Sequence, residues 1–318
     1  MNNCFLYPVI GLLCFSQFYE IIDTMNIVIA SRHNLPDWEV DDQLFFKSLI
    51  AHHIHYQVLP WDSDTDWSQF DACLIRTTWD YQERFPEFIE WIERVSKQTR
   101  LFNPTPVLLW NSHKRYLKEL EDNGIAIAPS EWLLQGGQYN ITHIMQKHGW
   151  HKGFIKPLIG ANARECCRFD NTTEGLALAQ AHVDRLTPEE DLVLQPYLST
   201  VEELGETSGI FFNNELSHGT RKIPVKGDYR VQDDYGAKDY PYQLTDKEQQ
   251  LAQQALAYVS NKFDTLLYAR IDFLHDPDGT PYLNEMELIE PSLFFRHGGE
   301  QSCNLLTKAI LQRLKDSN

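Results

Sequence analysis

The sequence predicts an α/β protein built from α+β lobes, because strand-like and helix-like patterns alternate along the chain. Of its 318 residues, 42% are hydrophobic and 12% are aromatic, which is enough for two or three packed subdomains. The sequence contains neither GxxxxGK before Ser or Thr nor GxGxxG. It therefore supports neither a P-loop nor a dinucleotide-binding fold.

The first elements predict a small βαβ unit. Strand patterns cover residues 26–31, 56–60 and 72–77, and an amphipathic helical pattern covers residues 41–52. The third strand leads into the polar segment RTTWDY at 76–81. Polar residues at the C-terminal end of a strand commonly line a binding site, and an ordinary loop around a packed Trp is the alternative.

The alternation continues through the rest of the chain. We expect helices at 86–97, 110–117 and 173–181 and strands at 125–128 and 153–157. Gly124 is expected to end the second of these helices. A last helix opens with a capping box formed by Thr245 and Glu248.

Residues 1–24 are treated as an extension outside the first domain. Their apolar stretch, residues 5–18, is too short to span a bilayer comfortably, and no Lys or Arg precedes it as in a signal peptide. The first strand pattern follows Met25, which leaves Met1 and Met25 as alternative translation starts.

The charge balance excludes some partners. The chain has 28 Lys and Arg residues against 45 Asp and Glu residues, a formal net charge of −17. Such a charge repels phosphate backbones and anionic lipids, so we expect neither nucleic acid nor membrane as a partner. The six cysteines lack CxxC spacing, which favours a reducing compartment and predicts a cytoplasmic protein.

The most informative segment is a predicted hairpin at residues 267–287. Apolar residues alternate with Tyr268, Arg270 and Asp272 in the first arm, as in a half-buried strand. In the second arm the same alternation places Leu283, Glu285 and Glu287 on one face, and Asn284, Met286 and Leu288 on the other. A two-residue loop at Asp278-Gly279 would set Asp272 opposite Glu285 and Arg270 opposite Glu287.

Asp272, Glu285 and Glu287 are therefore predicted to bind a cation. Carboxylates that face one point repel one another unless a cation lies between them, and hard oxygen ligands favour Mg²⁺ or Mn²⁺. A solvated hairpin with surface charges is the alternative. It fits less well because Asp, Asn and Glu are weak strand formers.

The pattern Arg270-x-Asp272 followed by Asn284-Glu285-x-Glu287 resembles the metal-binding end of the ATP-grasp ligases. Other segments resemble parts of that superfamily in the same order: WNSHKRYL at 110–117, GFIKP at 153–157, LQPY at 194–197, GETS at 205–208 and GDYR at 227–230. The segments RTTWDY, WNSHKRYL, GDYRVQ and MELIEPSLFF look most like the cyclo-ligase group of the cycloserine pathway.

The resemblance implies an ATP-grasp fold with an N-terminal pre-ATP-grasp βαβ domain. The implied boundaries are 25–110 for that substrate-side domain and 111–318 for the ATP-grasp domain, with lobes at roughly 125–195 and 196–318. The implied roles are ATP binding by Lys114, Lys156, Gln195, Tyr197, Glu206 and Lys222, charge stabilisation by Arg230 and Arg270, and substrate contacts by Arg76, Trp79, Asp80, Glu290 and Ser292. Many ATP-grasp ligases have Asn at the position of Glu287, so this metal site is more anionic.

The resemblance also implies a reaction that consumes ATP and uses Mg²⁺ or Mn²⁺. A small amino-acid-like carboxylate would attack the γ-phosphate to give ADP and an acyl phosphate, and an amine would displace phosphate to form a carbon–nitrogen bond. A carboxylate kinase and a non-catalytic ATP-binding protein are the alternatives. The identity of the carboxylate and amine, intramolecular or intermolecular ligation, and a homodimer remain open at this point.

Overall fold

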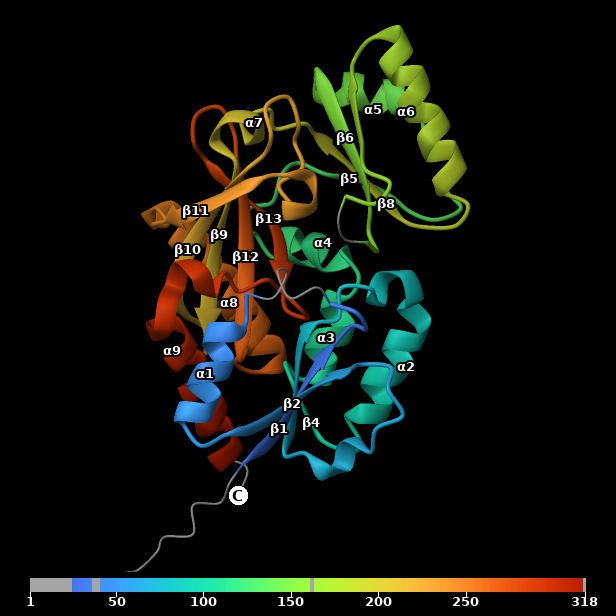
Figure 1. The fold of residues 1–318 in the computed structure, drawn as a ribbon. Helices are drawn as coiled ribbons and strands as arrows, with labels where there is room; N and C mark the ends of the chain where they lie inside the picture. The colour runs from blue at the N-terminus through green and yellow to red at the C-terminus, as the bar shows by residue number, and fades with distance from the viewer. Residues whose placement is uncertain (1–24, 36–40, 161–162, 317–318) are drawn as a thin grey trace, which may run out of the picture.

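Three β-sheets form the framework of the protein (Figure 1). The computed structural model describes residues 25–35, 41–160 and 163–316. The predictions for residues 1–24 lie outside the described residues.

The first sheet is parallel and has the strand order β2-β1-β3-β4. Its strands are β1 (Asn26–Ser31), β2 (His55–Pro60), β3 (Ala72–Thr77) and β4 (Arg100–Phe102). The helices around it are α1 (Gln43–Ala51), α2 (Phe85–Val95) and α3 (Thr105–Asn111), whereas α4 (Arg115–Asp122) packs in the core of the second sheet. The predicted βαβ unit is thus confirmed.

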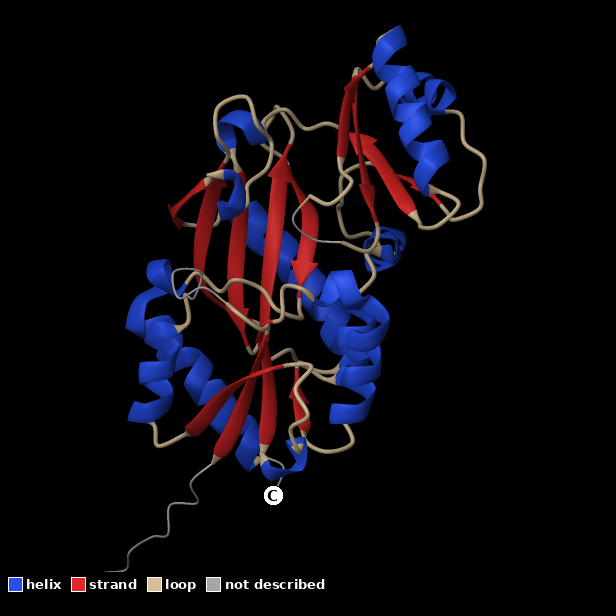
Figure 2. Ribbon diagram, turned by 45° about the vertical axis from the view of Figure 1, so that its right-hand side comes forward, coloured by secondary structure: helices blue, strands red, loops and turns tan. Residues whose placement is uncertain are grey.

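Both faces of this sheet are covered, which explains why β1 and β3 are almost continuously apolar. Ile27 and Ile29 pack with α1 and with α9 (Phe295–Lys315). Val28 and Ala30 point to the other face and pack with α2 and α3. The last helix of the chain therefore returns to the N-terminal domain, and α1 and α9 lie side by side (Figure 2).

The second sheet has the order β11-β10-β9-β12-β13 and is antiparallel. Its strands are β9 (Glu206–Phe212), β10 (Glu215–Ile223), β11 (Lys238–Tyr242), β12 (Tyr268–His275) and β13 (Pro281–Glu287). It follows the short helix α7 (Val201–Leu204), and α8 (Asp246–Phe263) packs against it through Leu251, Ala255 and Val259. Both capping-box bonds predicted between Thr245 and Glu248 are present at the start of α8.

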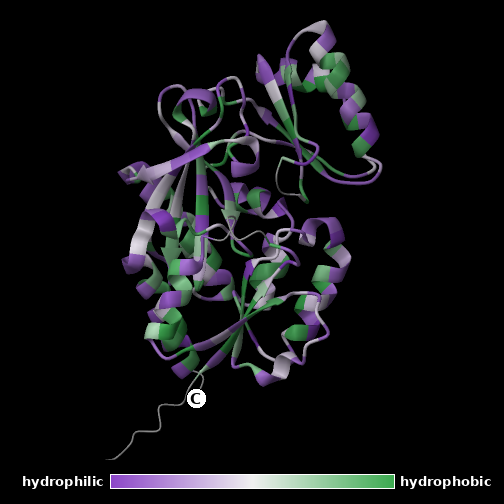
Figure 3. Ribbon diagram, in the orientation of Figure 1, coloured by the Kyte–Doolittle hydropathy of each residue, from purple (hydrophilic) through white to green (hydrophobic). Residues whose placement is uncertain are grey.

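The third sheet has the order β5-β8-β6-β7 and is antiparallel. It consists of β5 (Glu131–Leu133), β6 (Lys152–Pro157), β7 (Cys167–Asp170) and β8 (Leu192–Pro196), with α5 (Ile141–His148) and α6 (Thr173–Leu186) on one face. Hydrophobic residues gather along the strands and the covered helix faces (Figure 3).

Two local predictions were wrong. Residues 125–128 do not form a strand, because only Ile127 makes an isolated bridge, to Leu283. Segment 110–117 is not one helix, because α3 ends at Asn111 and α4 begins at Arg115. Lys114 lies in the interruption, and its backbone N–H donates to Leu158 O at 2.7 Å instead of continuing a helix.

Candidate active site

A cleft of about 800 Å³ lies among the three sheets. The third sheet contributes Phe154, Lys156, Gln195 and Tyr197, and the second contributes Glu206, Lys222, Arg270 and Asp272. The N-terminal part adds Trp79 and Lys114, and the segment after β13 adds Glu290 and Ser292. Most of the residues implied by the family resemblance therefore line one cavity.

The predicted pairing in the β12–β13 hairpin is present: Asp272 is opposite Glu285, and Arg270 is opposite Glu287. The turn differs from the prediction, because Gly279 N donates to Asp276 O and Asp276 N donates to Thr280 O. The loop therefore has three residues and ends at Gly279, whose φ of 83° suits glycine.

A β-bulge at Asn284 restores the predicted register. Phe273 pairs with Leu283, whereas the next residue toward the site, Asp272, pairs with Glu285. The extra residue reverses the predicted faces of Leu283 and Asn284. Leu283 is 1% exposed and lies in the core beside Met286, so its predicted position on the carboxylate face was wrong. Asn284 points into the cleft instead.

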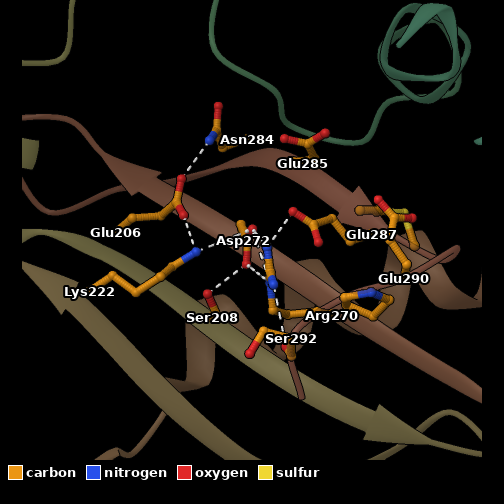
Figure 4. A network of polar contacts seen from close by, with 12 residues as sticks. Glu206, Ser208, Lys222, Arg270, Asp272, Asn284, Glu285, Glu287, Glu290 and Ser292 are labelled. Atoms are coloured by element: carbon orange, nitrogen blue, oxygen red, sulfur yellow. Dashed lines mark hydrogen bonds and ion pairs between the residues drawn. The ribbon is translucent and has the colours of Figure 1, made fainter. Parts of the chain in front are cut away.

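Asn284 connects the two lobes at the cleft. Its Nδ2 donates to Glu206 Oε2 at 2.7 Å (Figure 4). Its Oδ1 accepts from Lys156 Nζ at 3.1 Å. Alternation alone missed this residue, because a bulge inside a strand leaves no clear signal in the residue pattern.

Asp272 is the centre of a buried charge network. It accepts hydrogen bonds from Arg270 Nε at 3.0 Å and Nη2 at 2.9 Å, and from Ser208 Oγ at 2.5 Å (Figure 4). Lys222 Nζ lies 3.5 Å from Asp272 and also pairs with Glu206. Sequence analysis missed Ser208, although it lies directly opposite Asp272 in β9.

Glu285 and Glu287 are paired with different cations. Lys114 Nζ lies 2.7 Å from Glu285 Oε1 and donates to the carbonyl of Gly160 at 2.7 Å. Glu287 accepts from Arg270 Nη2. The acids that were predicted to need a metal thus also have protein cations beside them.

The pKa values reflect this crowding. Burial tends to raise the pKa of Asp272, but Arg270 and Lys222 outweigh it and hold the value at about 2. Burial raises the pKa of Glu287 to about 7, against the effect of Arg270, and Asp272 and Glu285 add to the rise. Burial, Glu287 and Glu285 raise the pKa of Glu290 to about 8. This part of the cleft therefore has excess negative charge.

At the other end of the cleft, aromatic rings from both lobes meet. Gln195 Nε2 donates to Ser130 Oγ at 2.9 Å, and the Tyr197 hydroxyl donates to Glu202 at 2.6 Å. The rings of Phe154, Tyr197 and Tyr229 are mutual neighbours, with centroids 6.3, 5.2 and 6.2 Å apart for the pairs Phe154–Tyr197, Phe154–Tyr229 and Tyr197–Tyr229. Only Tyr197 of this group was predicted from the sequence.

Arg230 lines the cleft, but its contacts lie within its own loop. Its Nη2 is 2.7 Å from Asp228 Oδ2, and its guanidinium group lies 3.9 Å from the centre of the Tyr235 ring. The structure does not bring it into the Arg270 network.

Two residues of the RTTWDY segment lie away from the cleft. Arg76 is 2% exposed and donates to both Asp42 oxygens at 2.7 and 2.9 Å and to Pro291 O at 2.8 Å. Asp80 accepts from Trp61 Nε1 at 3.1 Å. These positions do not favour the predicted substrate contacts, because the polar groups already hold protein partners. Trp79 does line the cleft, and its Nε1 donates to Glu290 O at 3.1 Å.

Among the described residues, no group of three His, Cys, Asp or Glu side chains is arranged as a ready metal site. The chemistry of the donors nevertheless fits Mg²⁺ or Mn²⁺, because Asp272, Glu285 and Glu287 are hard oxygen ligands on facing strands. Burial, with smaller contributions from Asp272 and Glu285, keeps the pKa of Glu287 raised in spite of Arg270, so a bound cation would favour its ionised form.

Solved structures of similar shape identify the class. D-alanine–D-alanine ligase from Bacillus anthracis has a TM-score of 0.64 at 14% identity, with 92% of this chain and all of that chain covered. The ATP-grasp ligase PsnB, solved with a precursor variant, Mg and ADP, has a TM-score of 0.60 at 15% identity, with 92% and 99% covered. These similarities show that the fold of the described residues is the ATP-grasp fold.

Closer relatives define the family within this class. Residues 27–103 match the N-terminal domain of D-cycloserine synthetase DcsG. The cycloserine biosynthesis protein DcsG of Streptomyces lavendulae is 30% identical over 272 residues, which cover 81% of this chain and 89% of the relative. The crystal structure of D-cycloserine synthetase DcsG has a TM-score of 0.83 at 26% identity and covers 91% and 99% of the two chains. The chain belongs to the DcsG family.

The predicted superfamily, fold class and enzyme class are thereby confirmed. No helix among the described residues is both long and apolar enough to cross a membrane.

Proposed function

We propose that the protein joins a small amino-acid-like carboxylate to an amine and converts ATP to ADP and phosphate. The main support is the concentration of Lys114, Lys156, Lys222 and Arg270 in one cleft of a chain whose net charge is −17. Lys and Arg side chains that gather in one cleft of a negatively charged protein are expected where a polyanion binds together with a metal ion.

In this proposal, Lys114 and Lys156 hold the α- and β-phosphates. Lys156 is 8% exposed, and burial lowers its pKa. A buried ammonium gains much from an anionic partner, and its present hydrogen-bond partner in the described residues, Asn284, is a neutral amide. Bound phosphate would compete with Glu285 for Lys114.

The opposite end of the cleft would receive the nucleoside. Gln195 and Tyr197 lie at the end of β8 with the aromatic rings of Phe154 and Tyr229 nearby, which suits a flat base. Glu206 would accept hydrogen bonds from the ribose hydroxyls in place of its present ion pair with Lys222.

Asp272, Glu285 and Glu287 would hold Mg²⁺ or Mn²⁺. When bound, the metal would neutralise charge on the phosphate oxygens. Arg270, fixed by Asp272 and Glu287, would stabilise the charge that develops on the transferred group and on the acyl oxygen. Lys222 would help to position the terminal phosphate. Arg230 would reach that phosphate only after it leaves Asp228.

In the first step the substrate carboxylate attacks the γ-phosphorus, and the bond to the ADP oxygen breaks. In the second step the amine attacks the acyl carbon, phosphate leaves, and the nitrogen loses a proton. Turnover by a carboxylate kinase would end after the first step.

The test is an assay of ADP, phosphate and amide with Mg-ATP and a panel of D- and L-amino acids. Each would be supplied alone and with methylamine, and the panel would include molecules that carry both a carboxylate and a free amine. We expect amide in proportion to ADP. ADP and acyl phosphate with no amide from any amine would identify a kinase, and no ADP across the panel would contradict the proposal.

A further inference from the structure

We propose that Glu290 binds the amine nucleophile, and that the buried side chains around residues 288–292 hold it in position. This inference rests on the proposed ligase function and assigns the amine to one end of the cleft. The first observation concerns hydrogen bonds to the backbone that carries Glu290.

Five consecutive backbone carbonyls, from Leu288 to Ser292, each accept a hydrogen bond from a side chain. The donors are, in order, Asn103 at 2.9 Å, Tyr268 at 2.7 Å, Trp79 at 3.1 Å, Arg76 at 2.8 Å and Arg270 at 3.3 Å. We call these five side chains the clamp. Four of them are at most 7% exposed.

The clamp makes this irregular segment rigid. Outside a helix or sheet, backbone carbonyls usually bond to water, and here buried side chains replace that water. The donors come from the N-terminal domain and from β12. The clamp therefore fixes the backbone that carries Glu290 relative to Arg270, which belongs to both the clamp and the charge network.

Glu290 differs from the other carboxylates of the cleft. Glu206, Asp272, Glu285 and Glu287 each have a Lys or Arg within ion-pair distance. In the part of the chain that the structure describes, Glu290 has no such partner, and its carboxyl group is hydrogen-bonded to its own backbone N–H. Lys114, whose charge acts on Glu290, is already bonded to Glu285 and Gly160.

A small side cavity opens beside Glu290. Its volume is about 30 Å³, and its walls include Tyr81, Ser112, Glu287 and Glu290. This is enough for a water-sized group, such as the nitrogen of a small amine. Glu290 and Glu287 also line the main cleft, and Figure 4 shows Glu290 beyond Glu287, at the end away from Glu206.

Only one of the three reactants matches this chemistry. ATP and the substrate carboxylate are anions and would be repelled by Glu287 and Glu290. The amine is a hydrogen-bond donor, and its protonated form is a cation, so it can bind an acid that has no ion-pair partner. Because burial and the neighbouring acids raise the pKa of Glu290 to about 8, a bound ammonium would also favour the ionised form of this side chain.

The test compares Glu290→Gln with the wild type for the best amino-acid and methylamine pair from the panel. We expect the KM for methylamine to rise on the order of tenfold to a hundredfold, as for the loss of a charge-assisted bond. The KM for ATP should change less than about twofold, because Glu290 is assigned to the amine and the substitution removes no proposed contact with ATP. Scrambling of oxygen isotopes in ATP, with the carboxylate alone, should persist because it reports only the first step.

Glu83→Gln is the matched control, because Glu83 is an exposed acid that lines neither cavity. Glu290→Asp keeps the charge but shortens the side chain and should give an intermediate KM. An unchanged KM for methylamine in Glu290→Gln, or a loss of isotope scrambling, would overturn the proposal. Melting curves of all variants show whether they fold.

A second readout does not require turnover. Methylammonium binding to the full chain with Mg-ADP, followed by ligand-observed NMR, should be weaker for Glu290→Gln than for the wild type. Equal binding by both proteins would refute the role of Glu290 whatever the turnover assays give. Absence of turnover in the wild type with a clear difference in binding would instead reject the ligase function and keep the cation site.

The clamp is tested by Trp79→Phe, which removes the N–H that donates to Glu290 O and keeps an aromatic ring. We expect a higher KM for methylamine with isotope scrambling intact, because the indole N–H donates to the backbone carbonyl of Glu290. A purely structural Trp79 would alter the melting temperature and leave the KM for methylamine unchanged, which would remove Trp79 from the clamp.

Discussion

Two buried arginine–aspartate pairs in this protein have the same chemistry and different surroundings. Arg76 is bonded to Asp42 at 2.7 and 2.9 Å, and Arg270 is bonded to Asp272 at 2.9 and 3.0 Å. Both aspartates are 2% exposed. The first pair joins α1 to the end of β3 inside the N-terminal domain, whereas the second lines the cleft.

The difference lies in what else surrounds each pair. Asp272 also has Lys222 and Ser208, and Arg270 also has Glu287. Arg76 donates from Nη1 to the neutral carbonyl of Pro291. A buried pair with further charges around it can exchange partners when a ligand binds, and an isolated pair cannot. Burial and pairing alone therefore do not separate a site from a structural contact.

The largest effect is expected for Arg76→Met. The change leaves Asp42 buried and without its cation, which typically costs about 3 to 5 kcal/mol of unfolding free energy. Urea denaturation would measure the loss. The double variant Arg76→Met with Asp42→Leu should recover most of it, because the buried charge is removed as well. Equal unfolding free energies of Arg76→Met and the wild type would contradict a structural role for the Arg76–Asp42 pair.

Arg270→Met should mainly affect catalysis. Loss of a donor that stabilises developing charge lowers kcat on the order of a hundredfold to a thousandfold. Unfolding free energy should fall less than for Arg76→Met, because Asp272 keeps Lys222 and Ser208. Steady-state ADP release and urea denaturation of the two variants, side by side, provide the measurement. A larger stability loss in Arg270→Met would reverse our assignment of the two pairs.

The sequence predicted the features that depend on local patterns. The βαβ unit and the capping box of α8 follow from alternation and capping residues. The sequence did not reveal features that depend on contacts between distant segments. Three examples are the hydrogen bond from Arg76 to the Pro291 carbonyl, the one from the Lys114 backbone N–H to Leu158 O between α3 and α4, and the one from Ser208 to Asp272.

The bulge at Asn284 shows how two errors in a prediction can cancel. The three-residue turn shifts the pairing by one, and the bulge shifts it back, so the carboxylates arrive at the predicted partners. Only the faces of Leu283 and Asn284 are exchanged. Variants at Leu283 and Asn284 therefore distinguish a bulged β13 from a regular strand.

The smallest effect is expected for Asn284→Ala. It removes one hydrogen bond to Glu206 and one from Lys156, which should weaken Mg-ATP binding by about 1 kcal/mol, or roughly fivefold in Kd. Calorimetric titration would measure this. Stability should change little, and Mg²⁺ with nucleotide should still raise the melting temperature, because the three acids remain.

Leu283→Ala is the matched control, because Leu283 is 1% exposed in the core. It should lower unfolding free energy by about 2 to 5 kcal/mol and leave the Kd for Mg-ATP unchanged in the folded fraction. A regular strand would give the opposite pattern, with Asn284 important for stability and Leu283 for the cleft. That outcome would show that β13 has no bulge at Asn284 and that Asn284 does not contact Lys156.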